Sequence, residues 1–243
     1  MKLLLLAGTR EARDVAEWLH GAAVPAVASF AGVTRAPELP RIETRVGGFG
    51  GEDGFRAFLD EAGITHVLDA THPFAAAISE RTARVTRTLG IAYRQLLRPP
   101  WAPGDGDRWH EIPAEEDAAA LIPPGARVFL ATGRQTLDRF HGLAGCHLIC
   151  RQIDPPERAF PLPNGEFLIG RPPFSVADER ALFEGLAIDW LVVKNAGGAS
   201  SATKLTAARA LGLPVAMIAR PPQPPGPKAA SAEEAIAWIK SQA

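Results

Sequence analysis

Residues 65–97 read THVLDATHPFAAAISERTARVTRTLGIAYRQLL, and this stretch decides the fold class. Two apolar runs of strand length, 65–71 and 91–97, flank the helical stretch 74–89. A strand, a helix and a second strand in this order are the unit from which parallel sheets with crossover helices are built. The stretch therefore predicts an α/β protein with a parallel sheet.

The same alternation continues on both sides of this stretch. In the first half, the predicted strands are 2–8, 24–30, 44–48, 65–71 and 91–97, and the predicted helices are 10–20, 51–62 and 74–89. In the second half, the predicted strands are 126–133, 147–153, 166–171, 189–195 and 213–219, and the predicted helices are 134–143, 175–187, 201–211 and 231–241. The five predicted strands of the first half match the five of the second, and the second half has one further helix at its end.

An internal repeat supports this match. Leu89-Gly90 and Arg98-Pro99-Pro100 recur as Leu211-Gly212 and Arg220-Pro221-Pro222, at an offset of 122 residues. The alternative is a chance match between common residues. The segment 98–109 is rich in Pro and Gly and is typical of a linker. We predict two tandem Rossmann-like parallel-sheet lobes, 1–104 and 105–243, with a cleft between them.

Charge and composition exclude several classes of protein. Lys and Arg total 26 against 27 Asp and Glu, which argues against bulk nucleic-acid binding. The first residues, MKLLLLAGTREAR, hold too short an apolar run for a signal peptide or a membrane span. Cys146 directly precedes the predicted strand 147–153 and Cys150 lies within it, so four residues of extended backbone keep them too far apart to bridge. We expect a cytoplasmic protein with buried thiols, no metal, and no nucleic-acid or membrane partner.

Ligands of open parallel sheets bind at the carboxyl ends of the strands. In the first half these ends carry Gly8-Thr9-Arg10, the glycine run 47–51 around Phe49, and Thr71-His72-Pro73. The glycine run is predicted to be a mobile lid. The alternative is that these segments are ordinary turns and that His72 is structural.

In the second half the strand ends carry mainly cations. Thr132-Gly133-Arg134-Gln135 follows one strand, and Lys194-Asn195 followed by Gly198 ends another. Arg151, Arg171 and Lys204 bring the number of cations at this edge to five. The alternative is that each cation is a solvated or paired surface charge. Together they predict a mouth that binds an anionic ligand.

The motifs GTREAR, GGFGG, DATHPFA, RPPW, TGRQ, RQIDPP, KNAGG and ATKL, in this order, resemble the precorrin-6A reductase family of cobalamin biosynthesis. The resemblance spans nearly the whole chain. It implies NADPH-dependent hydride transfer to a carbon of a precorrin tetrapyrrole, on two Rossmann-like domains that lack the usual glycine fingerprint. The family more often reads GGTSEAR where this chain has residues 7–13, and AGRT where it has 31–35.

This resemblance divides the strand-end residues into two sets. The residues expected to bind NADPH are Gly8, Thr9, Arg10, Arg13, Arg35, Thr71, His72 and Pro73. Those expected to bind the tetrapyrrole are Gly48, Phe49, Thr132, Gly133, Arg134, Gln135, Arg151, Arg171, Lys194, Asn195, Gly198 and Lys204. Enzymes of neighbouring pathway steps are further expected partners.

Two alternatives stay open at this point. The first exchanges the lobes, because Arg151 also lies where a reader of the cofactor's 2′-phosphate belongs. The second is a two-lobed tetrapyrrole or nucleotide binder, or a ring-modifying enzyme, without redox chemistry. No catalytic side chain is assigned, since the cofactor carries the hydride and the protein mainly positions the reactants.

Overall fold

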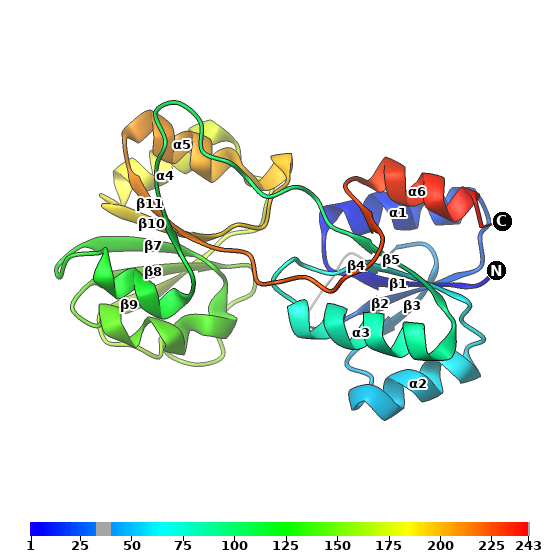
Figure 1. Cartoon of the computed structure of the whole chain (residues 1–243). Helices are drawn as coiled ribbons and strands as arrows, with labels where there is room; N and C mark the ends of the chain where they lie inside the picture. The colour runs from blue at the N-terminus through cyan, green and yellow to red at the C-terminus, as the bar shows by residue number, and fades with distance from the viewer. Residues whose placement is uncertain (33–39, 243) are drawn as a thin grey trace. The chain divides into compact units, whose positions relative to one another are not determined.

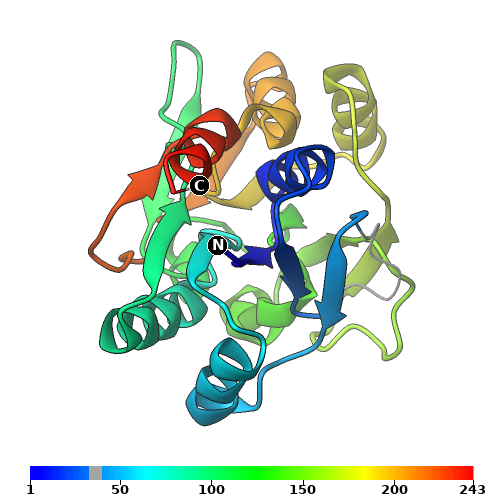
Figure 2. The ribbon, with the colours of Figure 1, turned by 90° about the vertical axis from the view of Figure 1, so that its right-hand side faces the viewer.

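The computed structural model describes residues 1–32 and 40–242. It divides the chain into two compact units, which we call unit 1 (Met1–Pro99 with Pro221–Ala243) and unit 2 (Pro100–Arg220). Figure 1 and, from a second side, Figure 2 show that each unit is a sheet covered by helices on both faces. The predicted α/β class is confirmed.

Unit 1 contains six parallel strands in the order β12-β5-β4-β1-β2-β3. Along the chain its elements are β1 (Leu3–Ala7), α1 (Arg10–Gly21), β2 (Ala26–Phe30), β3 (Glu43–Val46), α2 (Gly51–Glu61), β4 (His66–Ala70), α3 (Ala76–Leu89), β5 (Ala92–Leu96), β12 (Lys228–Ala229) and α6 (Ala232–Lys240).

Unit 2 repeats this strand arrangement in the order β6-β11-β10-β7-β8-β9, again all parallel. Its elements are β6 (Arg108–Ile112), η1 (Glu115–Ala120), β7 (Arg127–Ala131), η2 (Arg134–Leu143), β8 (His147–Gln152), β9 (Gly165–Ile169), α4 (Val176–Gly185), β10 (Trp190–Lys194), η3 (Ala199–Ser201), α5 (Thr203–Leu211) and β11 (Pro214–Ile218). The predicted helix at 134–143 is a 3-10 segment with non-helical backbone at Thr136 and Phe140.

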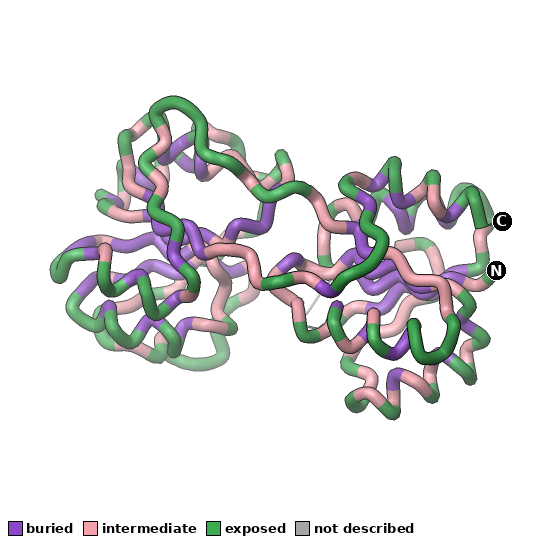
Figure 3. Tube along the Cα trace, in the orientation of Figure 1, coloured by how far each residue is buried: buried purple, intermediate pink, exposed green. Residues whose placement is uncertain are grey.

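Strand β1 shows how helices cover both faces of the unit 1 sheet. Its four leucines are almost fully covered, as expected of a central parallel strand. Leu3 and Leu5 pack with α1 and α6, whereas Leu4 and Leu6 pack with α2 and α3. In unit 2, α4 and α5 pack together in the same way. The most buried backbone in Figure 3 accordingly follows the strands.

The sixth strand of each sheet comes from an unexpected part of the chain. β6 follows β5 in sequence but pairs with β11, and β12 follows β11 but pairs with β5. The two units therefore exchange their last strands. The predicted lobe 105–243 differs from unit 2 in its last 23 residues, 221–243, and the predicted linker 98–109 includes the start of β6. β12 has only two residues, which is too short a run to indicate from the sequence which sheet it joins.

The described residues bear on the expectations for the thiols, for a membrane span and for a metal site. Cys146 and Cys150 are free and buried, as predicted, and burial raises the pKa of Cys150 to about 12. Within residues 1–32 and 40–242, no helix is long and apolar enough to cross a membrane. The same part of the chain contains no group of three or more His, Cys, Asp or Glu side chains placed to hold a metal ion.

Candidate functional site

In unit 1, the turn after β1 lies directly against the loop after β4. A Cβ at Gly8 would lie 3.2 Å from the His72 nitrogen and 3.4 Å from the Thr71 Cα, so glycine allows this close approach. Thr9 caps α1, where its Oγ1 accepts from the Ala12 amide at 3.2 Å and donates to the Ala70 carbonyl at 3.1 Å. The structure thus brings the first-half residues Gly8, Thr9, Thr71 and His72 together.

A buried carboxylate organises the loop after β4. Asp69 is fully buried, and one of its oxygens accepts from the Thr71 amide at 3.1 Å and from the Thr71 hydroxyl at 2.7 Å. Its other oxygen accepts from the Tyr93 hydroxyl at 3.1 Å. Burial, and then the charge of Asp69, raise the pKa of Tyr93, so the phenol stays protonated. The Thr71 side chain is therefore used to shape the loop.

The residues after Thr71 are held from a distant part of the chain. The Phe74 amide donates to His72 Nδ1 at 3.3 Å, and the two rings lie 5.8 Å apart. The Gln223 amide group donates to the Pro73 carbonyl at 2.9 Å and accepts from Gln95 at 2.8 Å. Gln223 follows the return of the chain into unit 1, and no local pattern in the sequence pointed to it.

Cations surround the start of α1. Arg10 and Arg13 are both exposed residues of its first turns. Glu11 forms a 2.6 Å ion pair with Arg98, and both side chains are largely buried. Arg35, which was predicted to read the 2′-phosphate, lies outside the described residues. Arg10 and Arg13 are therefore exposed residues of the helix that begins directly after the turn at Gly8.

The glycine run after β3 is anchored. The Arg45 guanidinium donates to the carbonyls of Gly47 and Gly48, both at 2.9 Å, and lies 3.9 Å from the centre of the Phe49 ring. Phe49 also packs edge-on against Phe55 at 4.9 Å. This packing favours a fixed position for Phe49, which would have to leave its neighbours to cover a ligand as the predicted lid.

In unit 2, the end of β10 meets the start of η2. Lys194 Nζ lies 3.2 Å from both Glu115 Oε1 and Thr136 Oγ1. Glu115, at the start of η1, is 4% exposed and also pairs with Arg139 at 2.7 Å. Lys194 is therefore near Thr132, Gly133 and Arg134, which follow β7, but its charge is already matched by an acid that the sequence analysis did not single out.

Arg151 lies in β8 and Arg171 follows the end of β9. Their ion pairs differ in strength and burial. Arg151 forms a two-bond ion pair with Glu179 of α4, at 2.8 Å for each bond, and stacks on Phe174 at 4.1 Å. Glu179 is 1% exposed, so this pair is part of the packing between β8 and α4. Arg171 is half-exposed, 3.8 Å from Asp154. Arg151 is thus engaged within the unit, while Arg171 faces solvent.

Trp101 ties together the loop after β10. The Asn195 side chain accepts from the Trp101 amide at 2.8 Å and donates to its carbonyl at 3.0 Å. The Trp101 indole donates to the Gly198 carbonyl at 3.0 Å, and Lys204 Nζ lies 5.7 Å from the ring. Burial lowers the pKa of Lys204 to about 8, an effect that the charge of Glu179 opposes. Asn195 and Gly198 therefore position this loop.

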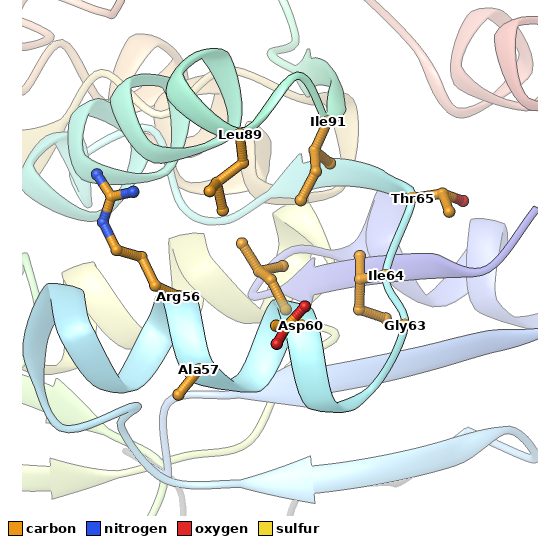
Figure 4. A pocket seen from close by; sticks show the side chains of 9 residues that line it. Arg56, Ala57, Asp60, Gly63, Ile64, Thr65, Leu89 and Ile91 are labelled. Carbon is orange, nitrogen blue, oxygen red and sulfur yellow. The ribbon is translucent and has the colours of Figure 1, made fainter.

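A separate cavity of about 570 Å³ lies in unit 1 between α2 and the end of α3. Figure 4 shows Ile64, Leu89 and Ile91 around it, with Arg56 and Asp60 on α2. Its lining includes the turn before β4, so it lies at the amino ends of the strands. None of the predicted site residues that the structure describes lines it.

Known proteins resemble this chain in sequence and in fold over nearly its whole length. The family model described as precorrin-6x reductase CbiJ/CobK matches residues 2–240. The precorrin-6A reductase of Rhodococcus erythropolis is 45% identical over 98% of this chain and 97% of its own. That of Rhodobacter capsulatus is 42% identical over 98% and 95%. A solved structure described as CobK precorrin-6A reductase superposes with a TM-score of 0.95 at 42% identity, over 99% of this chain and 96% of that one. The chain therefore belongs to the precorrin-6x reductase family.

Proposed function

We propose that this protein reduces precorrin-6A in cobalamin biosynthesis by NADPH-dependent hydride transfer to a carbon of the macrocycle. The relatives described as precorrin-6A reductases are 39–45% identical to this chain, whereas those described as cobalt-precorrin-6A reductases are 27–29% identical. This difference favours the ring without cobalt as the substrate.

The observation that carries the cofactor assignment is the turn at Gly8. Because no side chain stands between this turn and the loop after β4, backbone N–H groups are left to approach a diphosphate, as in dinucleotide-binding folds. Arg10 and Arg13 supply positive charge beside it. We therefore propose that NADPH is held by Gly8, Thr9, Arg10, Arg13, Thr71, His72 and Pro73 of unit 1, with Arg35 as the reader of its 2′-phosphate. When bound, NADPH supplies the hydride.

Unit 2 is proposed to hold the tetrapyrrole. The precorrin macrocycle carries carboxylates. Cationic partners for them are offered by Arg134, Arg171, Lys194 and Lys204. Arg151 and Asn195 contribute by fixing β8 and the loop after β10, because their side chains are already bonded within the unit. The chain's own residues then bind and orient the reactants and exclude water.

The test is the consumption of NADPH when the purified protein is given precorrin-6A. The nicotinamide absorbance should fall in step with the formation of a dihydro product. A tetrapyrrole binder without redox chemistry would be stabilised against heat by the same ligand but would leave the absorbance unchanged, which would contradict the proposal. NADPH should also be used well ahead of NADH.

A further inference from the structure

A row of three polar side chains crosses the carboxyl edge of the unit 2 sheet. The pairing of Leu130 with Cys150 places Thr132 opposite Gln152 when the register is continued by two residues. The pairing of Val193 with Ala131 likewise places Lys194 beside Thr132. Neighbouring strands are about 4.8 Å apart, so Gln152, Thr132 and Lys194 lie side by side.

All three side chains point to the same face of the sheet. Arg151 reaches Glu179 on α4, so the next residue, Gln152, points to the opposite face, the face of η1 and η2. Ala131 and Val193 pack in the cluster formed with α4 and α5, so Thr132 and Lys194 also point to the η1 and η2 face. The contact of Lys194 with Thr136 of η2 agrees with this direction.

Gln152 is unusual among the residues of this row. It is 8% exposed, yet neither its amide nitrogen nor its amide oxygen has a hydrogen-bond partner in the part of the chain that the structure describes. A buried amide without partners is unfavourable, because its groups have lost water without gaining hydrogen bonds. Buried polar groups of this kind are rare in proteins and point to a missing partner.

The surroundings indicate what that partner carries. Lys194 and Arg139 share Glu115, and Arg139 is also held by Glu116 in a two-bond pair, so these four charges balance. Arg134, one residue after Gly133, adds a positive charge next to the row. An anionic group is therefore favoured, and amide and hydroxyl donors lie beside the charge.

We propose that Gln152, with Thr132 and Lys194, forms a subsite for one carboxylate of the macrocycle, and that Gln152 is a specificity-determining residue in it. The inference rests on the proposed function for the identity of the ligand. The Gln152 amide N–H donates to the carboxylate oxygens, and so does the Thr132 hydroxyl once it leaves the Gly133 carbonyl, which lies 3.4 Å away. Lys194 offers a further N–H, and Arg134 supplies the positive charge that Glu115 and Glu116 do not balance. The Gln152 amide oxygen accepts from a water molecule that enters with the ligand.

Equilibrium binding of precorrin-6A without NADPH, followed by tryptophan fluorescence, tests this subsite. Gln152→Met removes the hydrogen bonds at similar volume and should raise the dissociation constant about tenfold. The melting temperature of the unliganded variant should stay the same or rise, because an unpartnered amide is lost. Gln152→Glu should weaken binding more than Gln152→Met, since it places like charge beside the carboxylate. Gln242→Met, at an exposed glutamine of unit 1, is the matched control.

Three outcomes would overturn the proposal. The first is an unchanged dissociation constant for precorrin-6A in Gln152→Met. The second is a clear loss of thermal stability in the unliganded Gln152→Met protein, which would mean that the amide holds the fold. The third is that both variants bind precorrin-6A normally but change the affinity for 2′,5′-ADP, in which case the row contacts the adenine ribose of the cofactor and its 2′-phosphate. Binding without any NADPH consumption by the wild type would contradict only the proposed function.

Discussion

The two sheets share one frame but end in different side chains. In unit 1 the positions equivalent to Gln152, Thr132 and Lys194 are Ala31, Gly8 and Thr71, because Ala7 pairs with both Phe30 and Ala70. At these positions unit 1 therefore has Ala, Gly and Thr. The hydroxyl of Thr71 is already bonded to Asp69. Unit 2 has an amide, a hydroxyl and an ammonium. The difference teaches that one strand order can carry two kinds of strand end, one that exposes mainly backbone groups and one that presents polar side chains.

The largest effect is expected where the unit 2 frame holds a buried charge. Glu179→Ala leaves the Arg151 guanidinium buried without its partner, so the free energy of unfolding should fall by about 3–5 kcal/mol. Urea denaturation measures this change. Glu184→Ala in the same helix removes only an exposed carboxylate 3.9 Å from Arg180 and should cost less than about 0.5 kcal/mol. Equal effects of the two variants would show that the buried pair is not needed.

Exchanging the side chains at the two central strand ends sharpens the comparison. Gly8→Ala places a Cβ 3.2 Å from the His72 nitrogen, so the loops must move apart, at a cost of about 1–3 kcal/mol. The KM for NADPH should rise at least tenfold, with little change in the KM for precorrin-6A. Thr132→Gly, its counterpart in unit 2, should do the reverse. If Gly8→Ala acts on precorrin-6A instead, the cofactor and substrate units have to be exchanged.

A smaller effect is expected at the cation that follows β7. Arg134→Ala should raise the KM for precorrin-6A about tenfold with little change in kcat, because an anchor acts equally on the ground and transition states. The wild-type KM should also depend more strongly on salt, since more charge pairs remain to be screened. Steady-state kinetics at two ionic strengths with saturating NADPH provide both values. A fall in kcat at unchanged KM would assign Arg134 to the chemical step.

The smallest effect concerns the titration of Lys204. Its pKa of about 8 in the folded protein lies below its ordinary value of 10.5, so above pH 8 the unfolded chain binds more protons at this group. Stability from Lys204 should therefore rise as the pH increases from 7 to 9, by on the order of 1 kcal/mol. Cys150, whose pKa burial raises, acts in the opposite direction only above about pH 9. Melting temperatures between pH 7 and 9 should show a rise that Lys204→Met lacks.

The sequence was sufficient for the elements that carry a strong local pattern. The leucines of β1 and the strand–helix–strand stretch around Asp69 predicted a parallel α/β fold, and the repeat at an offset of 122 agrees with two sheets of the same strand order. Strand β12 has only two residues, and no periodicity can be read from so short a run. Its place beside β5 depends on packing across the whole unit.

Among the candidate site residues, position along the strand was predictable but pairing was not. Arg151 and Lys194 do lie at carboxyl ends of strands, yet their acids, Glu179 and Glu115, come from helices 28 and 79 residues away in the chain. Asn195 meets Trp101 across 94 residues. Such partners come together only when the sheet folds. The sequence alone therefore does not show whether a cation at a strand end forms an ion pair.

The exchanged last strands have a consequence for protein synthesis. Strand β5 ends at Leu96, but its neighbour β12 ends at Ala229, about 130 residues later in translation. At a synthesis rate of about 5–20 residues per second, unit 1 waits on the order of 10 s with one sheet edge unpaired and the α6 side of its core uncovered. Open edges are templates for wrong pairing. A released chain that ends at Arg220 would therefore contain every residue of unit 2 but a unit 1 without β12 and α6.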